Sequence, residues 1–494
     1  MIVVHILDQI IIGIFISITI VLGFAGYKHS KTLHGYIFAN KSLGPWLLSF
    51  SIMATYYSAA SFLGGGGSTY LYNLGFGAWL TAWHVIGVSL LWLFIANKLY
   101  EYMSLYNIST IPEFIEHRYG SKVAKYIAVV VMIILFMLYL VSVYKGGAIV
   151  LSTVYGLDYA IALLILLLPV AIYIVVGGLR SAAINNLYLG VMMLIAAATT
   201  FSYIMAYIGG PLEGLRKLAN MTIAGKFSGS LWLRIDGAGP QPAIEKGMLV
   251  PLIMSITFSI GVAQIALPNI LVQFYTARNE KAIEKGRIIG PILVALYAML
   301  MFSLGAFCHL VIDSKVSNYQ VIQLMKDTDW VIPTAVNMIV PEGIRGLILA
   351  GPIAASMSTI AITILSMVTT LIKDVIQPFV KLDDKNALKF SKTLAILLSL
   401  LPIPFAILRN KLIVDMVGAA FGTIFAVFIG PVTIGLFWGR GCREGAIASM
   451  ISGAVTGIIW YIYIYGETLI YPTIPAIVVA LTTYIVPCLL KKRK

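Results

Sequence analysis

Long apolar stretches follow one another along almost the whole chain, separated by short polar segments. A helix needs about 20 apolar residues to cross the hydrocarbon core of a bilayer, which is about 30 Å thick. By this criterion the sequence predicts about thirteen transmembrane helices, and hence an all-α polytopic membrane protein. They are expected at about residues 10–27, 45–72, 76–97, 126–154, 159–178, 182–209, 248–275, 288–312, 344–372, 390–408, 412–438, 445–465 and 470–490.

The composition agrees with this pattern and excludes other classes of protein. Of the 494 residues, 60% are hydrophobic and only 11% are charged, whereas soluble domains carry about 25% charged residues. Soluble enzymes, disordered proteins and fibrous proteins are therefore excluded. Cys308, Cys442 and Cys488 are widely spaced and form no CxxC motif, so neither a disulfide framework nor a cysteine metal site is expected.

The net charge of +14 raises the alternative of nucleic-acid binding, but Lys and Arg also collect in the cytoplasmic loops of membrane proteins. An odd number of spans places the termini on opposite sides. With the N-terminus outside, 23 of the 34 basic residues fall in cytoplasmic segments, so we predict that the C-terminus is cytoplasmic and expect no nucleic-acid partner. These residues are Lys28, Lys31, Lys41, Lys98, Arg118, Lys122, Lys125, Arg180, Arg278, Lys281, Lys285, Arg287, Lys373, Lys381, Lys385, Lys389, Lys392, Arg440, Arg443, Lys491, Lys492, Arg493 and Lys494.

Two of the predicted spans contain residues that interrupt a helix. In the second span, small and hydroxylated residues over 53–62 precede Gly64–Gly67, and each glycine costs about 1 kcal/mol relative to alanine in a helix. In the seventh span, Gly261-Val-Ala-Gln264 precedes Pro268-Asn269. Because the two spans lie five helices apart, they predict two inverted five-helix repeats, each opening with a broken helix. The alternative is close helix packing, for which glycine is frequent in membrane helices.

The ninth span carries a small polar face. Ala355, Ser358 and Thr359 are spaced i, i+3 and i+4 and therefore share one side of a helix. Two hydroxyls and a carbonyl on one side can coordinate a small hard cation, with the remaining neutral oxygens supplied by an unwound partner helix. The alternative is that the hydroxyls bond back to carbonyls of their own helix.

Five segments of the chain resemble the sodium:solute symporter family, and they occur in the order found in that family. They are residues 54–65 (ATYYSAASFLGG), 111–120 (IPEFIEHRYG), 177–180 (GGLR), 354–359 (AASMST) and 435–440 (GLFWGR). The resemblance extends over about residues 35–460 and is strongest to the pantothenate and monocarboxylate permease branch. It implies a single transporter domain over 1–494 with a LeuT-type 5+5 inverted-repeat core. The repeats are expected at about 45–209 and 248–438, after a leading helix at about 10–27 and before two trailing helices at about 445–490.

The resemblance also implies a sodium site between the second and ninth spans as the only metal site, and no organic cofactor. Carried over by motif, its ligands are the carbonyls of Ala54, Tyr57 and Ala355 and the hydroxyls of Ser358 and Thr359.

The chain departs from the family at two positions. Many members carry an Asp after the Gly-Gly-Leu motif where this chain has Asn186, which argues against a second sodium site. Asn269 follows Pro268 where the family often has His, and both departures bear on the coupling ion and the solute.

Candidates for solute binding lie in the two broken helices and at one lysine inside the fourth span. Half-helix N-termini direct positive dipole ends to the midplane, which suits an anionic group such as a carboxylate. Lys145 is an ionisable group at membrane depth, and such groups are usually functional. It is expected to face a solute carboxylate, to titrate in place of a cation, or to extend to the outer interface. The candidates are Ser58, Ala59, Ser61, Gly64, Gly65, Gly66, Lys145, Gln264 and Asn269.

Together these features predict a secondary active transporter of the plasma membrane and not an enzyme. We expect sodium-coupled symport of a small, carboxylate-bearing organic solute by alternating access. The bilayer and the solute are the partners, and no obligatory protein partner is evident. Proton-coupled symport using Lys145 is the alternative. A channel, a membrane sensor or an intramembrane enzyme is less favoured, because the spans hold almost no carboxylate except Asp415 and the chain shows neither a filter motif nor an appended signalling domain.

Overall fold

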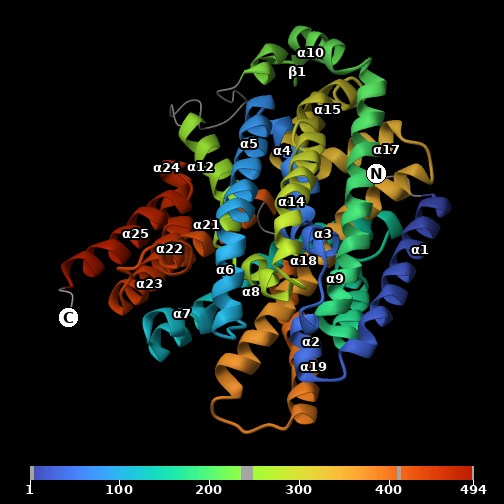
Figure 1. Cartoon of the computed structure of the whole chain (residues 1–494). Coiled ribbons are helices and arrows are strands. Elements are labelled where there is room, and N and C mark those ends of the chain that lie inside the picture. The colour runs from blue at the N-terminus through green and yellow to red at the C-terminus, as the bar shows by residue number, and fades with distance from the viewer. Residues whose placement is uncertain (1–4, 235–248, 409–412, 492–494) are drawn as a thin grey trace.

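The computed structural model describes residues 5–234, 249–408 and 413–491. The chain is helical almost throughout these ranges, and one short hairpin pairs β1 (Thr222–Ile223) with β2 (Phe227–Ser228). Figure 1 shows the long helices packed side by side, with the N-terminus and the C-terminus toward opposite ends of the bundle.

Eleven helices of the described residues are long and apolar enough to cross a membrane, or up to twelve when a bent pair near the N-terminus counts as one span. The helices that build them are α1 (Ile6–Gly23), α5 (Leu74–Leu90), α6 (Ala96–Leu105), α8 (Lys122–Tyr155), α9 (Tyr159–Ile208), α12 (Leu249–Gly261), α13 (Pro268–Leu271), α14 (Glu280–Met301), α15 (Leu304–Ile312), α18 (Ile344–Thr370), α19 (Asp384–Leu400), α20 (Ile403–Ile407), α21 (Ile413–Phe428), α22 (Gly435–Phe437), α23 (Arg443–Ile459), α24 (Tyr465–Thr468) and α25 (Thr473–Leu490).

The helix α9 accounts for the difference between this number and the thirteen predicted spans. It has 50 residues, about 75 Å of helix, which is more than twice the thickness of the hydrocarbon core. Gly178 interrupts it with a left-handed backbone (φ 56°, ψ −146°). A Cβ at Gly178 would lie 2.3 Å from the carbonyl oxygen of Tyr36, so glycine is required there. The two predicted stretches 159–178 and 182–209 both fall within α9.

The first predicted helix break is present, but it lies before the glycines. The helix α3 (Pro45–Tyr56) bends by 64° from the helical segment Ala60–Leu71, whose second half is α4 (Gly66–Leu71). The turn is at Tyr57, whose backbone is extended (φ −82°, ψ 111°). The second predicted break is also present: α12 ends at Gly261 and α13 begins at Pro268.

The run Gly64–Gly67, expected to be poor helix material, is helical in the structure. The glycines serve close packing instead. A Cβ at Gly67 would lie 2.2 Å from the carbonyl oxygen of Thr328, and one at Gly65 would lie 2.7 Å from the ring of Phe302. The cost of glycine in a helix is offset here because neighbouring helices approach its backbone.

The spanning helices form two sets of neighbours. In one, α8, α9 and α18 pack against one another, and α19 contacts α9 and α18. In the other, α5 packs against α12 and α14. The helix α3 contacts α14 and also α9 and α18, so the unwound end of α3 lies where the two sets meet.

Short helices and the hairpin cover the ends of the bundle. The connection after α9 holds α10 (Pro211–Asn220) and the hairpin, and Figure 1 shows them at the end opposite α2 (Leu33–Phe38) and α19. The connection between α15 and α18 holds α16 (Asn318–Lys326) and α17 (Val331–Ile339), and α7 (Ile111–Tyr119) precedes α8.

A buried ion pair attaches the leading helix α1 to the start of α18. One carboxylate oxygen of Asp8 accepts a hydrogen bond from Arg345 Nε at 2.7 Å. The other accepts from the backbone N–H groups of Gly343 and Gly346, both at 2.8 Å. Because the charge is paired and hydrogen-bonded on both oxygens, its burial is tolerated.

One expectation about the cysteines is wrong. Cys442 and Cys488 form a disulfide that joins the residue before α23 to the end of α25, with their Cα atoms 5.2 Å apart. The two helices run side by side, which brings together residues 46 positions apart in the sequence. Cys308 is a buried free thiol.

Candidate functional site

The unwound end of α3 lies against the middle of α18. A helix end leaves its last carbonyl oxygens without intrahelical partners, and here two hydroxyls of α18 approach them. Ser358 Oγ donates to the carbonyl of Ala54 at 2.7 Å. Thr359 Oγ1 lies 3.0 Å from the carbonyl oxygen of Thr55 and 3.5 Å from that of Tyr57.

The carbonyl of Ala355 completes this cluster. Its oxygen lies 3.0 Å from the hydroxyl oxygens of both Ser358 and Thr359. The structure therefore brings together the oxygens named from the sequence, and all five residues are buried, as is Thr55, whose carbonyl the sequence reading did not include. Each hydroxyl lies within hydrogen-bonding distance of a carbonyl of its own helix and of a carbonyl of α3. The bond back to the own helix is therefore present, and cation coordination stays a prediction.

The donor set of this cluster fits a small hard cation carried as cargo. All five groups are neutral oxygens, and each has lone pairs to offer once the hydroxyl hydrogens turn away from the centre. The neighbouring Asn186 is neutral too. Its amide Nδ2 donates to Thr55 Oγ1 at 3.1 Å, while its buried Oδ1 has no hydrogen-bond partner in the described part of the chain.

A small cavity lies beside the unwound segment. Its volume is about 20 Å³, room for about one water molecule. Its lining combines aromatic and aliphatic side chains with two serines. The lining residues are Tyr56, Tyr57, Ser58, Ala60, Ser61, Gly65, Leu80, His84, Ile260, Phe302, Val414, Val417 and Phe421.

Aromatic rings from several helices stack around this cavity. The rings of Tyr56 and Phe421 are nearly parallel with centroids 6.0 Å apart, and those of Tyr57 and His84 are nearly parallel at 5.5 Å. The hydroxyls of Tyr56 and Tyr57 donate to the carbonyls of Ile260 and Val294. The cavity wall is therefore mainly apolar ring surface.

His84 supplies one polar group to this wall. Its Nδ1 lies 2.6 Å from the carbonyl oxygen of Leu80, and a carbonyl only accepts, so Nδ1 carries the hydrogen. In the neutral imidazole this leaves Nε2 as an acceptor. Ser61 Oγ supplies a second polar group, bonded to the carbonyl of Ser58 at 2.6 Å and to the hydroxyl of Tyr297 at 3.1 Å.

Of the solute-binding candidates, Ser58, Ser61 and Gly65 line the cavity, whereas Ala59, Gly64 and Gly66 do not. A Cβ at Gly64 would meet Val414 at 3.1 Å, and Gly66 packs against Met301. Ala59 is fully buried and its Cβ would lie 2.4 Å from one added at Gly146. These three positions hold helices together.

Gln264 and Asn269 also lie outside the cavity lining. Gln264 Nε2 donates to the carbonyls of His84 and Gly261 at 3.1 and 2.9 Å, so it fixes the break in its own span against α5. Asn269 Nδ2 donates to Thr363 Oγ1 at 3.2 Å. Both amide oxygens are buried, and neither has a hydrogen-bond partner among the residues that the structure describes.

Lys145 is bound by a carboxylate that the sequence reading did not single out. Its Nζ lies 3.0 Å from Oδ2 of Asp329, in the connection between α16 and α17, and both side chains are buried. The backbone N–H of Ile413 donates to the same oxygen at 3.2 Å. Burial raises the pKa of Asp329 and the charge of Lys145 opposes that rise. Lys145 therefore joins α8 to this connection and to the start of α21, and does not extend to the interface.

Sequence reasoning missed most of the cavity wall. Phe302 and Phe421 carry no local motif, and aromatic residues make up 12% of this chain. Only the packing of α5, α14 and α21 around the broken helix selects these rings from the others.

Sequence comparison gives matches along nearly the whole chain. A family model described as the sodium:solute symporter family matches residues 36–453. The sodium/pantothenate symporter of Escherichia coli (strain K12) is 27% identical over 492 residues, which cover 97% of this chain and 96% of the relative. The sodium/proline symporter of Staphylococcus aureus (strain NCTC 8325 / PS 47) is 27% identical over 502 residues, covering 98% and 93%. The similar proteins are thus transporters and not enzymes.

Comparison of the backbone identifies the architecture. A Na⁺-coupled sialic acid symporter in a substrate-bound outward-open state is similar with a TM-score of 0.78 at 17% identity, covering 99% of this chain and 98% of that chain. A nucleobase-cation-symport-1 family transporter in a closed conformation, with bromovinylhydantoin bound, gives a TM-score of 0.55 at 14% identity, covering 92% and 93%. The predicted all-α LeuT-type fold is confirmed.

Replacing Lys145 tests the buried ion pair. Lys145→Met leaves the Asp329 carboxylate buried without its partner, and we expect the free energy of unfolding to fall by about 3–5 kcal/mol. Lys145→Met combined with Asp329→Leu removes both charges and should recover most of this loss. The measurement is thermal unfolding of the purified chain in detergent.

The control is Arg216→Met, because Arg216 belongs to an exposed pair with Glu213 and should cost less than about 1 kcal/mol. A Lys145→Met protein as stable as the wild type, or a double variant no better than the single one, contradicts the assignment.

Proposed function

The chain belongs to the sodium:solute symporter family, and from this premise we propose that it couples the inward movement of Na⁺ to the uptake of a small carboxylate-bearing solute. The observation that carries the proposal is the cluster of oxygens between α3 and α18. Ser358 and Thr359 meet carbonyls of the unwound segment at hydrogen-bonding distances, and no charged group belongs to the set.

Na⁺ in this cluster would bind two parts of the molecule at once. Ala355, Ser358 and Thr359 belong to α18, which packs with α8 and α9. Ala54 lies in α3, which also contacts α14, and Tyr57 follows directly after α3. The ion would replace hydroxyl-to-carbonyl hydrogen bonds by ion–oxygen contacts, and so favour arrangements that keep the two helices close. The membrane potential adds about 2.3 kcal/mol per charge per 100 mV to its inward movement.

The same unwound segment offers a route for coupling the ion to the solute. The carbonyl of Tyr57 faces the proposed ion site, while the Tyr57 ring and Ser58 line the cavity. A cation that orders this backbone also orders part of the cavity wall. The solute then binds more tightly, because less conformational entropy remains to be lost when the site becomes ordered. Because the cavity holds about one water molecule, it has to widen for a solute, as alternating access requires.

A carboxylate is the favoured chemical class of the solute. The helical segment Ala60–Leu71 begins at the cavity, and its first N–H groups carry the positive end of a helix dipole. Pantothenate and proline, named for two relatives, both carry a carboxylate. The apolar rings around the cavity suit the remainder of such a molecule.

Proton coupling through Lys145 gains no support from the contacts. Lys145 is held by Asp329 and lies outside the cavity lining and the proposed ion site. The ion pair joins α8 to the connection that carries Asp329.

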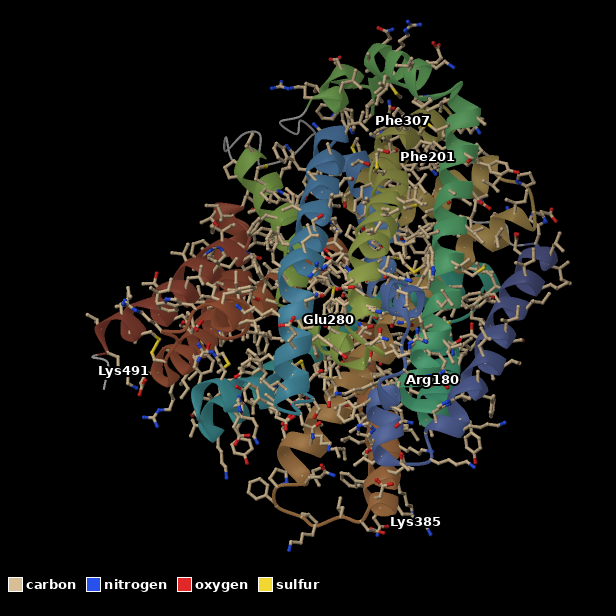
Figure 2. All side chains as sticks on the ribbon, viewed as in Figure 1. Arg180, Phe201, Glu280, Phe307, Lys385 and Lys491 are labelled. Atoms are coloured by element: carbon tan, nitrogen blue, oxygen red, sulfur yellow. A yellow bond between two sulfur atoms is a disulfide. The ribbon has the colours of Figure 1, made fainter. Side chains whose placement is uncertain are left out.

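We further propose a plasma-membrane location with the N-terminus outside and the C-terminus cytoplasmic. Figure 2 shows Arg180, Lys385 and Lys491 toward one end of the bundle and Phe201 and Phe307 toward the other. Three of the basic residues counted from the sequence, at 492–494, lie outside the described residues. Those counted within them include many at the end that holds α2 and α19, in agreement with the positive-inside rule.

Thiol labelling in intact cells tests the orientation. Tyr319→Cys lies in α16 and Lys385→Cys lies in α19, and both native side chains are exposed. A membrane-impermeant maleimide should label Tyr319→Cys directly and Lys385→Cys only after permeabilisation, with the wild-type chain as background. The opposite pattern would invert the topology.

Removing both hydroxyls tests the ion site. In proteoliposomes with an inward Na⁺ gradient, we expect Ser358→Ala/Thr359→Ala to raise the Na⁺ concentration for half-maximal uptake at least about tenfold, which corresponds to 1.4 kcal/mol. Ser356→Ala is the control, since Ser356 is buried on the same helix but donates to the carbonyl of Val143 at 3.0 Å. An unchanged Na⁺ dependence in the double variant would show that the ion binds elsewhere.

Paired solutes that differ only at the acid test the solute class. Thermal unfolding of the purified chain is measured in Na⁺ and in choline with pantothenate against panthenol and with proline against prolinamide. A solute present at 100 times its dissociation constant stabilises the folded state by about 2.7 kcal/mol. One of the two acids should therefore raise the unfolding temperature in Na⁺ but not in choline. Equal stabilisation by the matching alcohol or amide, or stabilisation by a sugar only, would refute the carboxylate assignment.

A further inference from the structure

A second and much larger cavity lies far along the chain from the proposed solute site. It opens where α7, the connection between α22 and α23, and the end of α25 meet, and its volume is about 830 Å³. Four of its lining residues are cationic. The lining residues are Arg118, Tyr119, Gly439, Arg440, Gly441, Cys442, Arg443, Cys488, Leu489 and Lys491.

The guanidinium of Arg118 is held in place on one side of this cavity. Its Nε donates to the carbonyl of Gly435 at 2.8 Å, and its Nη2 donates to the carbonyl of Trp438 at 2.8 Å. Both acceptors are neutral, so these two bonds orient the charge of Arg118 without neutralising it. An oriented guanidinium is suited to a phosphate, because its planar donors match the geometry of the oxygens.

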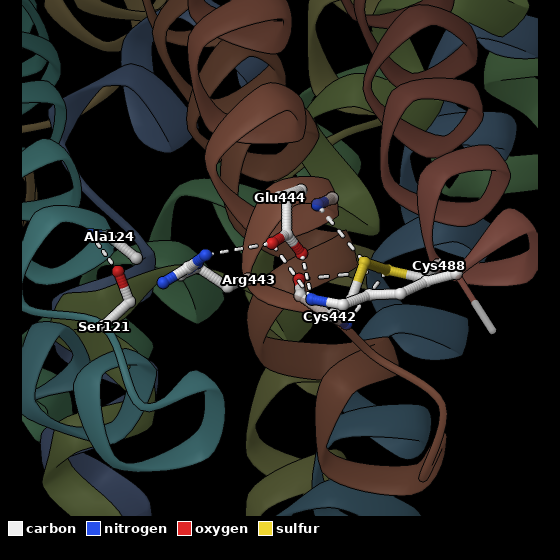
Figure 3. A network of polar contacts seen from close by, with 8 residues as sticks. Ser121, Ala124, Cys442, Arg443, Glu444 and Cys488 are labelled. Carbon is white, nitrogen blue, oxygen red and sulfur yellow. Dashed lines mark hydrogen bonds and ion pairs between the residues drawn. A yellow bond between two sulfur atoms is a disulfide. The ribbon is translucent and has the colours of Figure 1, made fainter. Parts of the chain in front are cut away.

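On the other side, two cations share one carboxylate. Figure 3 shows Glu444 beside Arg443 and the disulfide of Cys442 and Cys488, and the Nζ of Lys491 donates to the same carboxylate. The contacts are 3.2 Å from Arg443 Nη2 and 2.8 and 2.9 Å from Lys491 Nζ. Counting Arg118 and the exposed Arg440, four positive charges meet one negative charge, and the cavity has an excess of positive charge.

The surface beside this cavity is apolar and exposed. Phe437 is 49% exposed, Leu489 55% and Leu490 78%, and α25 is one of the helices that can cross a membrane. Large apolar side chains exposed on a spanning helix face acyl chains. A basic cavity at the end of such a helix therefore lies at the level of the lipid headgroups.

We propose that this cavity binds the headgroup of an anionic phospholipid whose acyl chains lie along α25. The phosphate would lie between Arg118 and the cations of the α22–α23 connection, and the lipid would join α7 of the core to the trailing helices α23 and α25. A lipid is favoured over a free phosphate because the cavity is much larger than that ion and because its rim continues into the apolar surface of Leu489 and Leu490.

Lipid binding to the full chain tests the proposal. The purified protein in detergent is titrated with phosphatidylglycerol or with phosphatidylcholine of the same chain length, and bound lipid is counted by native mass spectrometry. We expect retained phosphatidylglycerol and little retained phosphatidylcholine. Equal retention of the two lipids would overturn the proposal.

Two matched double variants identify the place of binding. Each cation near a lipid headgroup contributes about 1 kcal/mol, or about a fivefold change in affinity, so Arg440→Gln/Lys491→Gln should weaken phosphatidylglycerol binding roughly 25-fold. Lys381→Gln/Lys385→Gln removes the same charge from exposed positions outside the cavity and should leave binding unchanged. Equal loss in both variants would show general attraction to a basic surface and contradict a defined site.

Two further experiments distinguish a lipid-headgroup site from a loss of folding in the variants and from a site for a free anion. Arg440→Lys/Lys491→Arg keeps both charges and should keep phosphatidylglycerol binding, whereas loss in this variant would contradict a site for a charged headgroup. Inorganic phosphate at millimolar concentration should not displace the lipid. Displacement by inorganic phosphate alone would identify a free-anion site and overturn the lipid assignment.

Discussion

The rest of the structure depends on how the backbone carbonyls of one short unwound segment find hydrogen-bond partners at membrane depth. Backbone carbonyls without helical partners are costly in a bilayer unless protein or a polar cavity covers them. After α3 turns at Tyr57, the hydroxyls of Ser358 and Thr359 cover the carbonyls of Ala54 and Thr55. The break is therefore stable only while α18 lies against it. Because the carbonyls of α3 and the hydroxyls of α18 are each other's partners, a set of neutral oxygens, a cavity and two sets of packed helices lie around the same few residues.

The neutrality of these oxygens has an electrical consequence. None of the five proposed ligands carries charge, and the nearby position 186 is an asparagine. A bound Na⁺ would bring its full charge to the centre of the protein without a compensating carboxylate. The conformational step that carries the ion would then move net positive charge, and its equilibrium would respond directly to the membrane potential.

Much of the architecture and the polar face of α18 follow from the sequence, whereas the partners of individual side chains do not. Apolar length predicts the spans, and the spacing of Ser358 and Thr359 predicts a shared face, because both depend on local geometry. The position of the break, the disulfide and the Asp329 partner of Lys145 depend on residues brought together from distant parts of the chain. Glycine-rich sequence alone does not distinguish a flexible segment from a closely packed helix. The run Gly64–Gly67 is a closely packed helix.

The buried contact between Asp8 and Arg345 determines which set of helices the leading helix α1 moves with. Asp8 is bound by a side chain and two backbone groups at the start of α18, and α1 also lies along α9. The leading helix is therefore attached to the set of helices that contains α18, not to the set that contains α5 and α14. A spectroscopic label on the lipid-facing side of α1 would therefore move together with α18. The distance from this label to a second label on α14 would then measure how far the two sets of helices move relative to each other.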